Sequence, residues 1–205
     1  MLVAAAFSSV PAASASGQVS PGTEERAQLK DQIRHAFGEV PRPANSEIRD
    51  SSEGDEPYLL EKEFSDKKDW QSLDARFLDQ APDGYSSALS FFTSKAFRYY
   101  IPAYMIADVD RLLDHAEPAF HLWYGLDDET SRAKVNPRRY GGWTWAEATR
   151  QRFAPFTQPE AQAIVAYLRY KAKNDDFARP KINRALKNYW LSRAGEDAVP
   201  GQISR

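Results

Sequence analysis

Six large aromatic rings stand within residues 89–105, and this segment constrains the fold more than any other part of the chain. Each ring can bury about 150–250 Å² of surface, so the segment must lie at the centre of a hydrophobic core. Phe97, Ile101 and Tyr104 follow the i, i+4, i+7 spacing of one helix face, and Thr93 or Ser94 is placed to cap that helix. The six rings belong to Phe91, Phe92, Phe97, Tyr99, Tyr100 and Tyr104.

Pro102 lies inside this helical pattern. Because its ring removes a backbone N–H donor, the residue must either kink the helix or occupy the first turn of a new one. The sequence leaves this choice open.

The composition is that of an ordinary globular protein. Hydrophobic residues make up 42% of the 205 residues and charged residues 27%, which suffices for one domain with a real core. The absence of cysteine excludes disulfide bonds, a thiolate nucleophile and thiolate metal ligands. No apolar run approaches the roughly 20 residues of a membrane-spanning helix. We expect a helical domain over residues 23–193, between a disordered leader or signal peptide at 1–22 and a flexible tail at 194–205.

The beginning of the chain has two interpretations. Leu2–Phe7 is a short apolar run and Ala13–Ala15 resembles a signal-peptidase site, so residues 1–15 would be cleaved from an exported or periplasmic protein. No Lys or Arg precedes the apolar run, which favours the alternative, a disordered leader on a cytoplasmic protein.

Helical periodicity recurs along the domain, without the alternation typical of strands. Thr157-Gln-Pro-Glu160 is a capping box with proline in the first turn, and it opens the most clearly marked helix. We predict a mainly α protein, a single compact helical domain around the aromatic helix, with room for a few short strands. The aromatic helix is expected to continue through Leu112 and Leu113, and the polar segments 42–57 and 125–142 to be exposed loops. The other expected helices lie near 23–37, 58–64, 70–78 and 180–189.

The run from Ala88 to Tyr104, ALSFFTSKAFRYYIPAY, resembles the stretch LSFLSPEAFRYYLPAYL of a bacterial domain-of-unknown-function family, number 6714. A second similarity begins at Arg152-Phe153 and continues to Ile164, so the likeness covers about residues 58–171. Ser94-Lys95 stands where the family has Ser/Thr-Pro-Glu, a difference that matters little for a helix start. The resemblance implies no activity, cofactor or site, because the family has none established.

Charge is distributed unevenly along the chain. Residues 1–129 hold 12 basic and 23 acidic side chains, a net charge of −11, whereas residues 130–193 hold 14 and 4, a net charge of +10. Such asymmetry, with aromatic residues among the basic ones, is typical of polyanion binding. The alternative is that the two parts neutralise each other across the fold. The candidate partner-binding residues are Arg98, Arg138, Arg139, Arg184, Lys187 and Trp190.

Arg98 itself has two interpretations, because it stands inside the aromatic segment. It either presents its guanidinium to a partner beside Tyr99 or Tyr100, or buries its stem and holds a carboxylate or stacks on a ring. The sequence favours the second, structural role.

No motif points to a reaction or a cofactor. His115 and His121 are six residues apart with Pro118 between them, which is not a common ligand spacing, and no nucleophile elbow, phosphate loop or dinucleotide fingerprint occurs. We predict no metal, cofactor or catalytic residue, and leave the oligomeric state open. The leading hypothesis is a small non-catalytic interaction or accessory protein, immunity-like, whose partner is another protein. The alternatives are a nucleic-acid-binding module using residues 130–193 and an enzyme with an unrecognised acid/base site.

Overall fold

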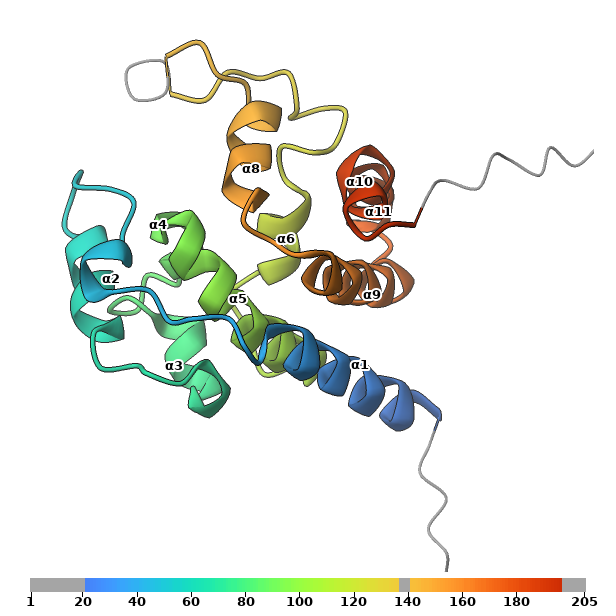
Figure 1. Cartoon of the computed structure of the whole chain (residues 1–205), viewed down its shortest axis with the longest axis horizontal. Coiled ribbons are helices and arrows are strands. Elements are labelled where there is room, and N and C mark those ends of the chain that lie inside the picture. The colour runs from blue at the N-terminus through green and yellow to red at the C-terminus, as the bar shows by residue number, and fades with distance from the viewer. Residues whose placement is uncertain (1–20, 137–140, 197–205) are drawn as a thin grey trace, which may run out of the picture.

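The computed structural model describes residues 21–136 and 141–196 (Figure 1). Within these ranges the backbone forms helices and no strand, with isolated bridges at Arg49–Phe92 and Lys134–Thr144, so the expected mainly α fold is confirmed. The helices are α1 (Pro21–Phe37), η1 (Asn45–Glu47), α2 (Glu56–Phe64), η2 (Trp70–Ser72), α3 (Ala75–Gln80), α4 (Ala88–Phe91), α5 (Ser94–Val109), α6 (Pro118–Trp123), α8 (Trp145–Phe153), α9 (Gln158–Asn174), α10 (Arg179–Ala185), the π-helical turn η3 (Leu186–Trp190) and α11 (Leu191–Arg193).

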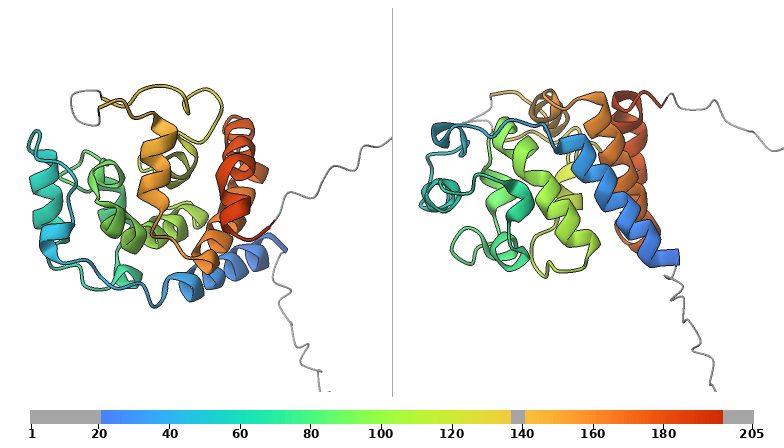
Figure 2. Two further views of the ribbon diagram at one scale, coloured as in Figure 1. Left: turned by 45° about the horizontal axis from the view of Figure 1, so that its top comes forward. Right: turned by 60° about the horizontal axis from the view of Figure 1, so that its bottom comes forward.

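Three long helices form the centre of the fold (Figure 2). α1 packs against both α5 and α9, and α10 with η3 packs on the other side of α9. Leu29, Ile33 and Phe37 lie on one face of α1 and are buried, as their spacing predicts.

The aromatic segment lies in the core as expected. Phe97 and Ile101 have no exposed surface, and the ring of Phe97 packs against that of Phe153 with centroids 5.9 Å apart. Phe153 in turn contacts Trp190 at 4.8 Å. The core therefore joins α5 to α8 and η3, which are distant in sequence.

The structure shows where α5 begins and ends and that Pro102 lies within it. The side-chain oxygen of Thr93 accepts a hydrogen bond from the N–H of Ala96 at 3.1 Å, so Thr93 is the N-cap. α5 continues through Pro102, which therefore begins no new helix. The helix does not extend to Leu112, because it ends at Val109 and Arg111 adopts a φ of +60°; Leu112 is 57% exposed.

Other expectations need correction. The helix expected over 70–78 is the short η2 followed by α3, which Asp74 caps through the N–H groups of Arg76 and Phe77. The loops expected to be exposed bury Ile48 and Val135, and the helices α6 and α8 lie where no helix was predicted.

The ends of the chain are only partly covered by the structure. The expected leader or signal peptide, within residues 1–20, and residues 197–205 lie outside the described residues. Ala194 is buried, and its carbonyl accepts hydrogen bonds from the side chains of Gln158 and Gln162. In the described ranges no helix combines the length and the apolar character needed to cross a membrane.

Candidate binding groove

The uneven charge of the sequence is partly balanced across the fold. Lys173 on α9 holds Glu25 on α1 at 2.9 Å, and Lys171 holds Asp108 on α5 at 2.9 Å. On α10, Arg184 pairs with Asp128. Some cations of the basic part are thus paired with carboxylates of the acidic part, which agrees in part with the second interpretation of the sequence.

Four exposed cations in the described part of 130–193 have no such partner. Arg132, Lys134, Arg150 and Lys187 have no acidic side chain within ion-pairing distance among the residues that the structure describes. All four are exposed. Within the described part of 130–193, the exposed cations without an ion pair therefore lie around α8 and η3.

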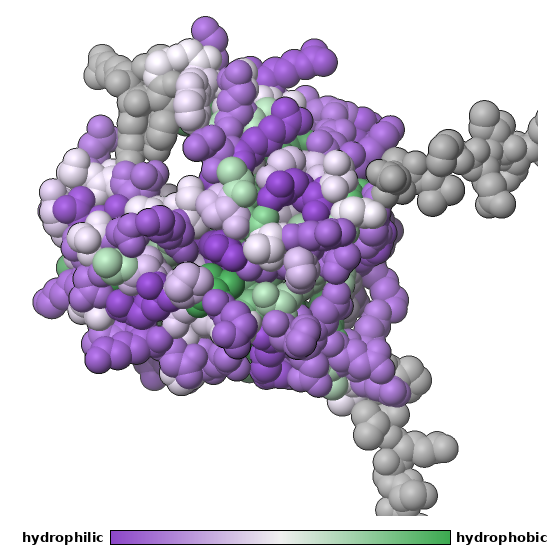
Figure 3. All heavy atoms as spheres, viewed as in Figure 1, coloured by the Kyte–Doolittle hydropathy of each residue, from purple (hydrophilic) through white to green (hydrophobic). Residues whose placement is uncertain are grey.

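Two of these cations line one hollow of about 360 Å³ between α8, η3 and the segment 131–135. We call it the basic groove; its walls carry Ser131, Arg132, Thr144, Arg150 and Asn188. Lys134 forms the bridge with Thr144, and Lys187 precedes Asn188 in η3. Hydrophilic residues predominate on the adjoining surface over α8 and α10 (Figure 3).

Short-range hydrogen bonds build one wall of the basic groove. The N–H of Trp145 donates to the carbonyl of Ala133 at 2.9 Å, which holds the segment 131–135 against the start of α8. Thr144 caps α8 in a capping box, and its N–H donates to Glu147 at 2.7 Å. The hydrogen bonds from the Thr144 backbone and hydroxyl hold the pKa of Glu147 below its usual value, so this carboxylate stays charged at the helix N-terminus.

Gly125 allows the chain to pass close beneath α8. Its φ is +80°, and a side-chain Cβ there would lie 2.5 Å from the Thr149 hydroxyl and 3.0 Å from the Trp145 carbonyl. The position requires glycine for both reasons. Its N–H donates to the hydroxyl of Thr130 at 2.8 Å, which anchors the turn below the groove.

The opposite wall is formed by the π-helical turn η3. Such turns are rare and are frequently found at functional sites. Asn188 projects from η3 and donates to the carbonyl of Leu126 at 2.9 Å and to Asp128 at 3.2 Å. These contacts fix η3 to the turn that precedes the 131–135 segment.

The described residues that were predicted to bind a partner do not form one site in the structure. Arg98 holds Glu160 through two hydrogen bonds of 2.8 and 2.6 Å, Arg184 holds Asp128, and Lys187 is exposed on η3. Trp190 has no exposed surface, and its indole N–H donates to the Leu122 carbonyl at 2.8 Å. Arg138 and Arg139 lie outside the described residues.

The groove residues were not singled out from the sequence. Thr144-Trp-Ala-Glu147 is a capping-box pattern that marks the start of α8, and it is the local signal that could have directed attention to this region.

His121 is partly buried, and its ring packs edge-on against that of Phe120 with centroids 5.3 Å apart. Burial, with the nearby positive charge of Arg152, lowers the pKa of His121 to about 3. In the described residues no three His, Asp or Glu side chains come together as metal ligands.

A family model described as "Family of unknown function (DUF6714)" matches residues 25–194. The chain belongs to this family. The match confirms the resemblance carried by the aromatic segment, and it extends over all the helices from α2 to α11. No match to this DUF6714 chain was found among curated proteins or among solved structures.

Proposed function

We propose that this DUF6714 chain is a non-catalytic interaction protein whose basic groove binds an acidic surface of a partner protein. The observation that carries the proposal is that Arg132 and Arg150 line one groove, that no acidic side chain is among the described residues lining it, and that neither arginine forms an ion pair with a described residue. Exposed like charges held close together repel each other, so an acidic partner would relieve a cost that the isolated chain bears.

The surroundings of the groove favour a protein over a nucleic acid. Asp128 and Glu129 stand next to the turn that underlies the groove, so the rim carries both signs of charge. A mixed rim suits a protein surface with complementary charges, whereas the uniformly negative backbone of a nucleic acid would meet those carboxylates. Trp190, the aromatic residue among the candidate partner-binding residues, is buried.

The test is affinity purification of the tagged full-length chain from its native host, with and without nuclease. We expect a stoichiometric protein partner that survives nuclease and is lost from the double variant R132E/R150E. A matched control is K62E/K68E, which reverses two exposed lysines on the α2 side of the molecule that have no ion pair in the described residues.

The captured partner is then titrated at several salt concentrations. We expect its affinity to fall at least about tenfold in R132E/R150E, because like charges would face each other, and to stay unchanged in the control. Equal binding by the two variants would refute the role of the groove. Companions that disappear on nuclease treatment would instead establish nucleic acid as the ligand.

A further inference from the structure

Trp143 leaves a large ring exposed beside the basic groove. It is 45% exposed, whereas Trp70, Trp123 and Trp190 are buried. No aromatic ring or cation of the described residues packs on its indole. Single exposed apolar residues are common on protein surfaces, so the meaning of this one depends on the side chains around it.

Trp143 lines an open hollow of about 450 Å³ with Glu147, Arg150 and Gln151 of α8. Arg150 also lines the basic groove, so the hollow and the groove meet at this arginine. Trp143, Arg150 and Arg132 therefore lie along one continuous surface. Tryptophan and arginine are enriched among the residues that dominate the free energy of binding at protein interfaces.

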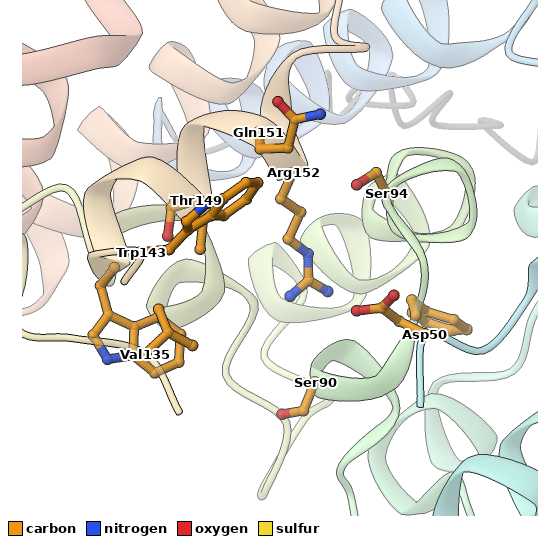
Figure 4. A pocket seen from close by; sticks show the side chains of 11 residues that line it. Asp50, Ser90, Ser94, Val135, Trp143, Thr149, Gln151 and Arg152 are labelled. Atoms are coloured by element: carbon orange, nitrogen blue, oxygen red, sulfur yellow. The ribbon is translucent and has the colours of Figure 1, made fainter. Parts of the chain in front are cut away.

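The backbone of Trp143 is fixed by the fold. Its carbonyl accepts a hydrogen bond from the N–H of Val135 at 3.0 Å, and the next residue, Thr144, caps α8. Figure 4 shows Trp143 beside Val135 in a neighbouring pocket that both residues line. Because the backbone is already held, the indole loses little conformational freedom when a ligand covers it.

Charge divides this surface into two ends. Glu147 lines the hollow at the Trp143 end, and it accepts hydrogen bonds from the N–H and the hydroxyl of Thr144 at 2.7 and 2.9 Å. Its carboxylate would repel a second negative group there. At the other end Arg150 and Arg132 form no ion pair with a described residue, so they would attract carboxylates. The surface therefore suits a ligand with an uncharged ring at one end and negative charge at the other.

We infer that the protein partner contributes an acidic segment with one aromatic residue, whose ring packs on the indole of Trp143 while its carboxylates reach Arg150 and Arg132. An aromatic ring fits better than an aliphatic side chain, because it gains from contact with the indole and from the nearby guanidinium of Arg150. The seven positions from Trp143 to Arg150 correspond to roughly 10 Å along a helix, which an extended chain spans in about three residues. This inference rests on the proposed function of the basic groove and specifies the segment that the groove recognises.

The test uses synthetic peptides, capped at both ends and labelled with a dye, in which phenylalanine stands three residues from an acidic group. They are FSGDEE and its reverse EEDGSF, so that both directions along α8 are covered, and each has a counterpart with alanine in place of phenylalanine. Fluorescence anisotropy gives the Kd of each peptide for the full-length chain. For one direction we expect the wild type to bind the phenylalanine peptide about tenfold more tightly than its alanine counterpart.

The variant W143A should bind the phenylalanine and alanine peptides alike. F177A is the matched control and should keep the preference, because Phe177 is 84% exposed and lines neither the hollow nor the groove. R132E/R150E should weaken the binding of all four peptides, because the carboxylates would then meet like charges.

The double variant also separates this inference from the proposed function. If R132E/R150E loses the peptides but the wild type binds the phenylalanine and alanine forms equally, the groove takes acidic ligands and the inference about Trp143 is wrong. The inference is likewise overturned if W143A keeps the preference or if none of the peptides binds the wild type. If R132E/R150E binds the peptides as tightly as the wild type does, the proposed function of the groove fails as well.

Discussion

Replacing Arg98 by methionine should lower the free energy of unfolding by about 3–5 kcal/mol. The variant keeps an apolar stem of similar length but removes the guanidinium from Glu160. The side chain of Glu160 is 3% exposed, so its carboxylate would remain buried without the two hydrogen bonds of 2.8 and 2.6 Å that now neutralise it. Removing one partner of a buried ion pair lowers the free energy of unfolding by more than the intact pair contributes to it, because an uncompensated charge is left buried.

The reverse substitution should cost less. In E160Q the guanidinium of Arg98, whose side chain is 21% exposed, can still reach water. The loss is then about 1.5–3 kcal/mol, the usual contribution of hydrogen bonds to a charged group. The double variant R98M/E160Q leaves no buried charge, so it should be more stable than the sum of the two single effects predicts.

The four proteins are compared by urea denaturation followed by circular dichroism, with the midpoint and slope fitted together. The reasoning is refuted if R98M loses less than about 1 kcal/mol, or if the double variant shows no coupling between the two sites. If R98M keeps its stability but no longer captures the protein partner, Arg98 is a binding residue and not a structural one.

Three further predictions concern the core and its titrating groups. Phe97→Ala should cost about 3–5 kcal/mol, because the ring is fully buried against Phe153; a near-neutral effect in urea denaturation would show that the ring is not a core element. Asp79→Ala should cost about 3 kcal/mol at neutral pH, because Asp79 accepts three backbone N–H bonds from residues 114–116. Burial alone would raise the pKa of Asp79, but these bonds outweigh it and lower the pKa, so the stabilisation exists above the unfolded pKa of about 3.9 and is lost as the pH falls through the lower folded pKa. The difference between wild type and D79A should shrink on acidification, and a constant difference would contradict this. His121 has a folded pKa of about 3, so below about pH 6.5 the unfolded chain gains a proton that the folded chain excludes. As the pH falls below this value, the free energy of unfolding should decrease by about 1.4 kcal/mol per pH unit, beyond the contribution of other titrating groups. A plot of the free energy of unfolding against pH should therefore be flatter for H121Q, and identical plots for H121Q and the wild type would rule out His121 as a cause of the pH dependence.

The centre of the fold could be predicted from the sequence because its signals are local. Phe97, Ile101 and Tyr104 are spaced for one helix face, and all three are buried in α5. Thr157 and Glu160 form the expected capping box at the start of α9. Each of these features depends on residues within two turns of one another, which is the range over which helical periodicity and capping act.

The helix α8 escaped prediction because it has no continuous apolar stripe. Of its nine residues only Thr149 and Phe153 are buried, and three of the others are charged. Its position depends on contacts that lie outside its own sequence, such as the close passage of Gly125 under Thr149. Propensity and periodicity within the segment contain no information about such contacts.

The basic groove escaped prediction for a different physical reason. The net charge of a sequence counts all cations equally. In the fold, the positive potential near a cation depends on whether a carboxylate lies close to it. Lys173 and its partner Glu25 are 148 residues apart, and Arg184 and Asp128 are 56 apart. These pairings remove charge from α9 and α10 and leave Arg132 and Arg150 as the uncompensated pair that lines the groove. The proposed binding site is therefore centred on the two arginines of the basic part that no carboxylate of the described residues pairs with.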